Sequence, residues 1–174
     1  IWRRVTREPI RKKVVVLDEV WSLLKLPQAA SFVVELYRRF RRYNAAAYAV
    51  TQSLEDFQGE EARGILQNTT YHYVLRLATE DGLVQRLLNL PDRAMDAFRS
   101  LSSKKGAYSE ALAWIRQEDG LAGGVIVLRP SPVEYWAYTT NAEDMAYREK
   151  VLEEHGGELI PALDELARAY PSGV

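Results

Sequence analysis

The stretch that most constrains the fold is residues 14–17, Val-Val-Val-Leu, which lie directly before two carboxylates. Three β-branched residues followed by a leucine favour a strand that is buried on both faces, as in the parallel sheets of α/β proteins. Such strands rarely include charged residues, yet Asp18 and Glu19 follow at once. We therefore expect a buried strand that delivers a pair of carboxylates at its end.

Further strands and helices continue this pattern through the first half of the chain. Residues 26–44 have the apolar spacing of a helix, with Asn44 as a left-handed stop. Residues 46–52 and 71–77 are the next apolar strands, and a helix is expected over residues 60–67 between them. This alternation predicts an α/β fold with a mostly parallel sheet flanked by crossover helices.

The second half of the chain has short helices first, then strands with a Gly-containing loop, and finally two helices. The expected elements are helices over residues 81–90 and 91–101, two strands within residues 109–130, a third strand over 134–140, and helices over 145–155 and 159–170. Asn141 with Asp144 resembles a capping box before the first of the two final helices. We therefore expect an antiparallel strand segment followed by two C-terminal helices.

The composition excludes several kinds of site. The chain has no cysteine, so disulfides, zinc–thiolate sites and cysteine nucleophiles are ruled out. Its two histidines, His72 and His155, are too few for a histidine-rich metal site. No apolar run approaches the roughly 20 residues that a transmembrane helix needs. A cytoplasmic protein fits this composition best.

The carboxylate pair lies where ligands bind in open parallel sheets, beyond the carboxyl ends of the strands. Four apolar residues followed by Asp-Glu is also the Walker B pattern of P-loop nucleotide hydrolases. In that pattern the Asp holds Mg²⁺ at the terminal phosphates of ATP, and the Glu orients or deprotonates the attacking water. Asp18 is thus a candidate Mg²⁺ ligand and Glu19 a candidate catalytic base. Alternatively, Asp18 caps the following helix and Glu19 is merely exposed.

Two neighbouring features favour the catalytic interpretation. Gln52 ends the next strand, so its amide would lie beside the carboxylates and could sense the terminal phosphate or the water; otherwise it opens a surface loop. The intervening helix ends in Arg38, Arg39, Arg41 and Arg42. These cations can simply complement the helix C-terminus. One of them could instead act as an arginine finger on the nucleotide of a neighbouring subunit.

The phosphate-binding P-loop motif, G-x-x-x-x-G-K-[ST], is absent from the chain. Residues 59–66 have the glycine spacing, but Ile65 and Leu66 replace the Lys and the Ser/Thr, and Glu60 would repel phosphate. In the inferred fold the P-loop precedes the Walker B strand. We therefore expect it upstream of Ile1.

Four segments together resemble a known family: VVVLDEVWSLL, YRRFRRYN, AVTQSLEDF and ILQNTTYHYVLRL. They are similar to the C-terminal ATPase domain of the VirB/TraC-type conjugation and type IV secretion ATPases, in the HerA/FtsK group of RecA-like motors. The similarity is tightest over residues 13–77, where the elements D-E-x-W, R-x-x-R-x-x-N and T-Q-x-x-x-D occur in the family's order. It continues more loosely through GAYSEALAWI and LRPSPVEYWAYTTNAEDM.

The resemblance implies that residues 1–174 are a single partial RecA-like ATPase domain, the Walker B half, without the N-terminal part that carries the P-loop. It implies a hexameric, cytoplasmic ATPase that uses ATP and Mg²⁺ at the cytoplasmic face of the inner membrane. Other components of the secretion machine would be its partners, and DNA is a further candidate. Because the Walker A segment is missing, we expect the chain to be inactive alone.

The resemblance also assigns roles to the candidate residues. Asp18 and Glu19 would be the Walker B pair and Gln52 the phosphate sensor. The arginine motif near a subunit boundary would be supplied by one of three residues: Arg38, Arg41 or Arg42. The alternative function is a non-enzymatic partner-binding or assembly domain of RecA-like ancestry.

Overall fold

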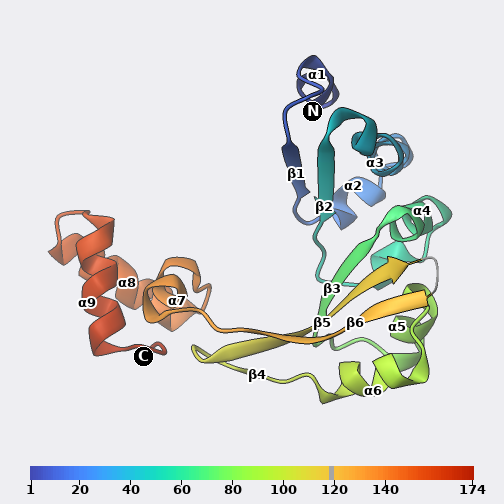
Figure 1. Cartoon of the computed structure of the whole chain (residues 1–174). Helices are drawn as coiled ribbons and strands as arrows, with labels where there is room; N and C mark the ends of the chain where they lie inside the picture. The colour runs from blue at the N-terminus through green and yellow to red at the C-terminus, as the bar shows by residue number, and fades with distance from the viewer. Residues whose placement is uncertain (118–119) are drawn as a thin grey trace. The chain divides into compact units, whose positions relative to one another are not determined.

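The computed structural model describes residues 1–117 and 120–174 (Figure 1). They pack as two compact units. The first comprises Ile1–His72, Leu77–Ala97 and Trp114–Gly123, and the second comprises Tyr73–Arg76, Phe98–Ala113 and Gly124–Val174. No helix among the described residues is long and apolar enough to cross a membrane. That the chain is one partial RecA-like domain stays a prediction.

Helices and strands alternate along the first half of the chain, as the sequence predicts. The elements there are α1 (Trp2–Arg7), β1 (Lys13–Leu17), α2 (Trp21–Leu24), α3 (Pro27–Arg39), η1 (Phe40–Tyr43), β2 (Ala45–Ala49), η2 (Glu55–Phe57), α4 (Glu60–Asn68) and β3 (Tyr71–Leu75). The second half continues with α5 (Asp81–Leu88), α6 (Asp92–Ser100), β4 (Ser103–Lys104), β5 (Tyr108–Gln117), β6 (Gly120–Leu128), α7 (Pro132–Tyr138), α8 (Ala142–Glu154) and α9 (Leu159–Ala169).

β1 and β2 form a two-stranded parallel sheet, in register from Lys13 opposite Ala45 to Leu17 opposite Ala49. The connection between them runs through α2, α3 and η1, so the predicted strand–helix–strand unit is confirmed (Figure 1). Because the two strands are parallel and in register, their carboxyl ends lie at the same edge of the sheet. This places the residues that follow Leu17 and Ala49 near one another.

One face of this sheet is open to solvent. Val14 is 64% exposed and Val16 is 62% exposed, while Leu17 on the other face is buried. Val16 pairs with Tyr48, which shares the open face and is 52% exposed. The expectation of a strand buried on both faces is therefore wrong. Among the described residues, only one face of these two strands is covered.

β3 belongs to a second sheet. That sheet has the order β3–β5–β4, and β6 also pairs with β5, so the expectation that β3 extends the parallel sheet is wrong. The two strands predicted within residues 109–130 are present as β5 and β6, which pair with one another, and β5 also pairs antiparallel with the unpredicted β4, with Ser103 opposite Ser109. β3 buries His72 and Val74 and exposes the residues between and beside them, an alternation typical of a sheet with one solvent face. The predicted loop between β5 and β6 falls at residues 118–119, outside the described residues.

The strand predicted over residues 134–140 is wrong, because α7 occupies these residues. A capping box starts the helix: the Ser131 hydroxyl accepts from the Glu134 amide, and the Glu134 carboxylate accepts from the Ser131 amide at 2.7 Å. Pro132 takes the first helical position, where its fixed φ favours a helix. The chain therefore ends in three helices, α7 to α9, rather than two.

α7, α8 and α9 share an apolar core centred on Trp136, which is fully buried. Its indole N–H donates to the Tyr170 carbonyl at 2.6 Å, so the polar atom of this side chain is satisfied. Asn141 caps α8 by accepting from the Asp144 amide at 3.2 Å, as expected from the sequence. Gly156 ends α8 in the left-handed region, with φ of +64°.

Candidate functional site

The backbone at the end of β1 makes a sharp turn that is tied to β2. The Val50 amide donates to the Leu17 carbonyl at 2.9 Å, and the Val20 amide donates to the Val50 carbonyl at 3.0 Å. Between these two bonds lies Glu19, whose φ of +49° is in the left-handed region that non-glycine residues seldom adopt. Non-glycine residues in this conformation concentrate at functional sites and turns.

Both oxygens of the Glu19 carboxylate accept a hydrogen bond. The Gln52 amide nitrogen donates to Oε1, and the Trp21 indole nitrogen donates to Oε2. The predicted juxtaposition of Gln52 with the carboxylate pair is thus present, and the amide contacts Glu19. Two residues that are distant in sequence meet here because they follow adjacent parallel strands.

Asp18 differs from Glu19 in its exposure and its hydrogen bonds. Its side chain is exposed, and Oδ1 accepts from the Glu19 amide at 3.0 Å. Within residues 1–117 and 120–174 the structure gives Oδ2 no hydrogen bond, and no three His, Cys, Asp or Glu residues cluster as a metal site. Mg²⁺ usually binds one or two carboxylates together with phosphate oxygens and water. A single exposed carboxylate therefore fits the protein's share of such a site.

The loop that carries Gln52 is closed by its own side chains. The Thr51 hydroxyl donates to the Asp56 carboxylate at 3.1 Å and accepts from the Ser53 amide at 3.3 Å. Thr51 and Asp56 are the first and last residues of the T-Q-x-x-x-D element, which explains their spacing. Thr51, Asp56 and Trp21 are functional candidates missed from the sequence, although the D-E-x-W and T-Q-x-x-x-D elements contain all three.

Of the four arginines at the end of α3 and in η1, one is bound by neighbouring side chains and three are exposed. Arg39 forms an ion pair with Glu35 and lies over the ring of Trp2, 4.7 Å from its centroid. The hydrogen bond that Arg39 donates to the Glu35 carboxylate raises the pKa of the Arg39 guanidinium. The three exposed arginines, for which the described part of the chain shows no hydrogen bond or ion pair, are Arg38, Arg41 and Arg42.

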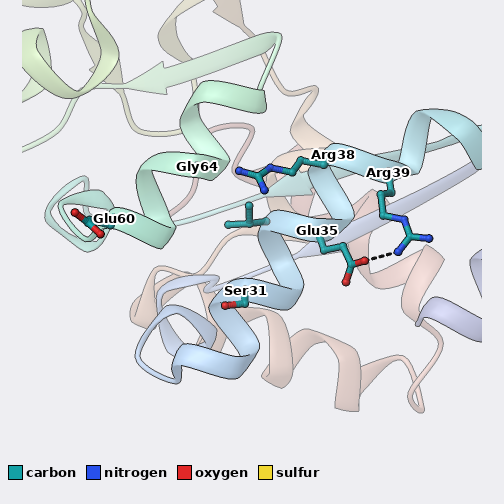
Figure 2. A pocket seen from close by; sticks show the side chains of 7 residues that line it. Ser31, Glu35, Arg38, Arg39, Glu60 and Gly64 are labelled. Carbon is teal, nitrogen blue, oxygen red and sulfur yellow. Dashed lines mark hydrogen bonds and ion pairs between the residues drawn. The ribbon is translucent and has the colours of Figure 1, made fainter.

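A shallow groove lies between α3 and α4 (Figure 2). Its lining residues are Ser31, Val34, Glu35, Arg38, Arg39, Glu60 and Gly64. Arg38 extends toward α4, whereas Arg39 turns to Glu35 (Figure 2). A Cβ at Gly64 would lie 3.3 Å from Val34, so this glycine allows the helices to pack closely. Gly64 thus lies inside a helix, which agrees with the conclusion that residues 59–66 are not a phosphate loop.

Asn44, the last residue of the R-x-x-R-x-x-N element, has a structural role. It ends η1 in the left-handed conformation with φ of +54°, as predicted. Its side-chain amide donates to the Ile10 carbonyl at 2.9 Å, and its own carbonyl accepts from the Lys13 amide at 3.0 Å. Asn44 therefore joins the segment that enters β1 to the turn that enters β2.

Comparison with known proteins supports one family. The model of the TraG P-loop domain matches residues 3–170. TraC of Escherichia coli (strain K12) is 31% identical over 114 residues, which are 62% of this chain and 13% of TraC. The structure of VirB4 of Thermoanaerobacter pseudethanolicus matches with a TM-score of 0.55 and 24% identity, over 83% of this chain and 35% of VirB4. The VirB4 match shows a shared fold.

These matches confirm the resemblance that the D-E-x-W, R-x-x-R-x-x-N and T-Q-x-x-x-D elements indicate. The chain spans a small part of TraC and about a third of VirB4. The family model, in contrast, covers nearly all of the chain, including the carboxylates after β1 and the three C-terminal helices. The chain belongs to the TraG P-loop domain family.

Proposed function

We propose that the chain supplies the metal-holding and water-activating carboxylates of an ATP-hydrolysing motor that energises conjugative DNA transfer or type IV secretion. The observation that carries this proposal is the environment of Glu19. Its carboxylate accepts from Gln52 across two parallel strands and lies next to the exposed Asp18. A base, an amide sensor and a metal ligand at one sheet edge are the groups that nucleotide hydrolysis requires.

Asp18 is the proposed Mg²⁺ ligand. Its Oδ1 accepts from the Glu19 amide at 3.0 Å, while Oδ2 accepts no hydrogen bond from the described residues and is available to a ligand. Bound Mg²⁺ neutralises the charge on the terminal phosphates of ATP. Asp18 would hold the ion through one carboxylate oxygen, because the described residues contain no group of three or more His, Cys, Asp or Glu side chains that could hold a metal ion.

Glu19 is the proposed base. A carboxylate oxygen has two lone pairs, so each oxygen of Glu19 can accept from a water as well as from its present donor. Glu19 would orient the attacking water and take up its proton. Gln52 would sense the terminal phosphate, since its amide can exchange its bond with Glu19 for a bond with a phosphate oxygen.

Self-association would supply the remaining positive charge. Arg38, Arg41 and Arg42 are exposed and could reach the nucleotide of a neighbouring subunit in a hexamer. Arg39 is a poor candidate, because its guanidinium is engaged by Glu35 and Trp2. ATP and other components of the secretion machine, with DNA as a further candidate, are the proposed partners. The proposed location is the cytoplasmic face of the inner membrane.

The 174 residues contain no G-x-x-x-x-G-K-[ST] motif to hold the phosphates. We therefore expect this chain alone to bind Mg-ATP weakly and to hydrolyse it at a negligible rate. Turnover by the isolated chain comparable to that of a complete motor would contradict this expectation.

The test compares Asp18→Asn with Glu19→Gln in the full-length product of the gene that encodes this chain. Glu19→Gln keeps the size of the side chain but removes the proton acceptor, so hydrolysis should fall about 10²–10⁴-fold while ATP binding persists. Asp18→Asn removes charge from the metal ligand and should weaken Mg²⁺-dependent ATP binding itself. The control is Glu143→Gln, an exposed carboxamide substitution on α8, which should change neither quantity.

The two variants must differ for the proposal to stand. Equal and mild effects of Asp18→Asn and Glu19→Gln would mean that the carboxylates only start α2. In that case a non-enzymatic partner-binding or assembly domain becomes the better account of the chain.

A further inference from the structure

We infer that Trp21 is a positioning residue, whose indole N–H holds the Glu19 carboxylate in the orientation in which it acts on water. The inference rests on the proposed function of Glu19. Trp21 has no part in that proposed function, and the observation behind its new role is the hydrogen bond from Trp21 Nε1 to Glu19 Oε2.

The two donors on Glu19 differ in where they come from. Gln52 follows another strand, and its side chain is exposed, so it can leave Glu19 when it senses a phosphate. Trp21 is two residues from Glu19 in the same turn, so their hydrogen bond persists when Gln52 moves. The indole therefore keeps one carboxylate oxygen fixed throughout a catalytic cycle.

The chemistry of the indole suits this role. An indole N–H donates a hydrogen bond but accepts none, and it does not titrate near neutral pH. It can orient Glu19 without competing for the proton that Glu19 takes from water. A hydroxyl at the same place could also accept a hydrogen bond from the water, and an ammonium would place a positive charge beside the carboxylate.

Trp21 is itself held in place. Lys25 is the residue after the end of α2, and its Nζ lies 4.1 Å from the centroid of the indole ring. The Ser22 amide and hydroxyl both donate to the Glu19 carbonyl, at 3.0 Å and 2.9 Å. Hydrogen bonds from Ser22 thus hold the backbone of Glu19, and the hydrogen bond from Trp21 holds its side chain.

The first experiment tests the contact in the isolated chain. The indole N–H resonances of the four tryptophans are recorded by ¹H–¹⁵N NMR in the wild-type chain and in Glu19→Ala. The Trp21 resonance should move upfield, because its indole loses a carboxylate acceptor. The Trp136 resonance should stay unchanged, since that indole donates to the Tyr170 carbonyl. A Trp21 resonance that does not respond to Glu19→Ala overturns the inference, whatever the rate of hydrolysis.

The second experiment tests the consequence in the full-length gene product. Trp21→Phe keeps an aromatic ring but removes the donor, so kcat should fall by about tenfold or more while KM for ATP and the melting temperature stay near wild type. Trp21→His retains a ring N–H and should recover part of the loss. Lys25→Ala removes the cation over the ring but keeps the indole N–H, so its kcat should fall by less than that of Trp21→Phe.

A double variant separates positioning from a general structural effect. In a Glu19→Gln background, Trp21→Phe should cause no further loss of kcat, because the residue through which Trp21 acts has lost its function. An independent loss there, or a wild-type kcat for Trp21→Phe alone, overturns the inference. Full activity of Glu19→Gln on its own would instead overturn the proposed function, while the NMR result still decides whether Trp21 binds Glu19.

Discussion

Glu19 and Asp144 are both acidic side chains with several hydrogen-bond donors, but they lie in opposite kinds of environment. Glu19 is only partly buried, has a left-handed backbone and accepts from two side chains. Asp144 is fully buried at the start of α8. Comparing them distinguishes a carboxylate that is available to a ligand from one that only holds the fold together.

Both carboxylate oxygens of Asp144 are bound by other groups of the protein. Oδ2 accepts from the Tyr135 hydroxyl and forms an ion pair with Lys105 at 3.1 Å. Oδ1 accepts from the Val174 amide at 2.9 Å, which fixes the last residues of the chain against α8. A buried charge is tolerated when it is paired and hydrogen-bonded in this way. Asp144 thus has a structural role, although both of its carboxylate oxygens are bound by other groups of the protein.

The number of hydrogen-bond donors around a carboxylate therefore does not show whether it is reactive. The donors of Asp144 come from three segments of the second unit, and the side chain is fully buried. The donors of Glu19 are one amide and one indole at an accessible strand end. Substitutions of Asp144 should therefore lower the stability of the protein, whereas substitutions of Glu19 should lower its activity.

The largest effect on stability is expected for Asp144→Ala. The substitution leaves the Tyr135 hydroxyl and the Val174 amide without an acceptor, at roughly 1–3 kcal/mol each, and removes the partner of Lys105, so the free energy of unfolding should fall by about 3–5 kcal/mol. Urea unfolding followed by helical circular dichroism measures this loss. Glu19→Ala is the matched control and should cost less than about 1 kcal/mol, because its side chain is accessible. Equal costs would remove the distinction between the two carboxylates.

A smaller loss of stability is expected when a side chain is added at Gly106, next to Lys105, the ion-pair partner of Asp144. Gly106 has φ of +67°, and a Cβ there would overlap the backbone of Ser172. Gly156 has nearly the same φ, +64°, but open space around it. Gly106→Ala should therefore cost about 2–4 kcal/mol, from backbone strain plus overlap, and Gly156→Ala only about 1 kcal/mol. Similar losses for both variants would show that the C-terminal segment does not pack against Gly106.

The smallest effect is the response to acid. Burial raises the pKa of Asp144, but the hydrogen bonds from Tyr135, Val174 and Lys105 outweigh it and hold the pKa below its usual range. A carboxyl group whose folded pKa is depressed contributes stability above its unfolded pKa and loses it as the pH falls through the folded value. The second unit should thus lose stability below about pH 4, and Asp144→Asn should lessen this dependence. An unchanged acid response in Asp144→Asn would assign it to other carboxylates.

The sequence predicted the position of Gln52 beside the carboxylates better than it predicted the sheets around them. Val14 to Leu17 and the apolar run before Gln52 specify two parallel strands, and parallel strands bring their carboxyl ends together. This local rule was enough to place Gln52 beside Glu19. It could not show that one face of the sheet is open, nor that β3 belongs to another sheet, because strand pairing depends on contacts between distant residues.

Two other features were missed for different reasons. The helix α7 was predicted as a strand because its aromatic residues alternate, yet Ser131, Pro132 and Glu134 form a helix-start signal that was present in the sequence. The burial of Asp144 had no local signal, since Lys105 and Val174 reach it from far along the chain. The helix α7 could therefore have been predicted from its start signal, whereas the burial of Asp144 could be seen only in the structure.

The most direct test of the central claim measures ATP hydrolysis per folded molecule for Glu19→Gln and Asp144→Asn in the full-length gene product. We predict that Glu19→Gln unfolds like the wild-type protein but hydrolyses ATP about 10²–10⁴-fold more slowly. Asp144→Asn should unfold more easily while its folded molecules hydrolyse ATP at the wild-type rate. A wild-type rate for folded Glu19→Gln would contradict the account.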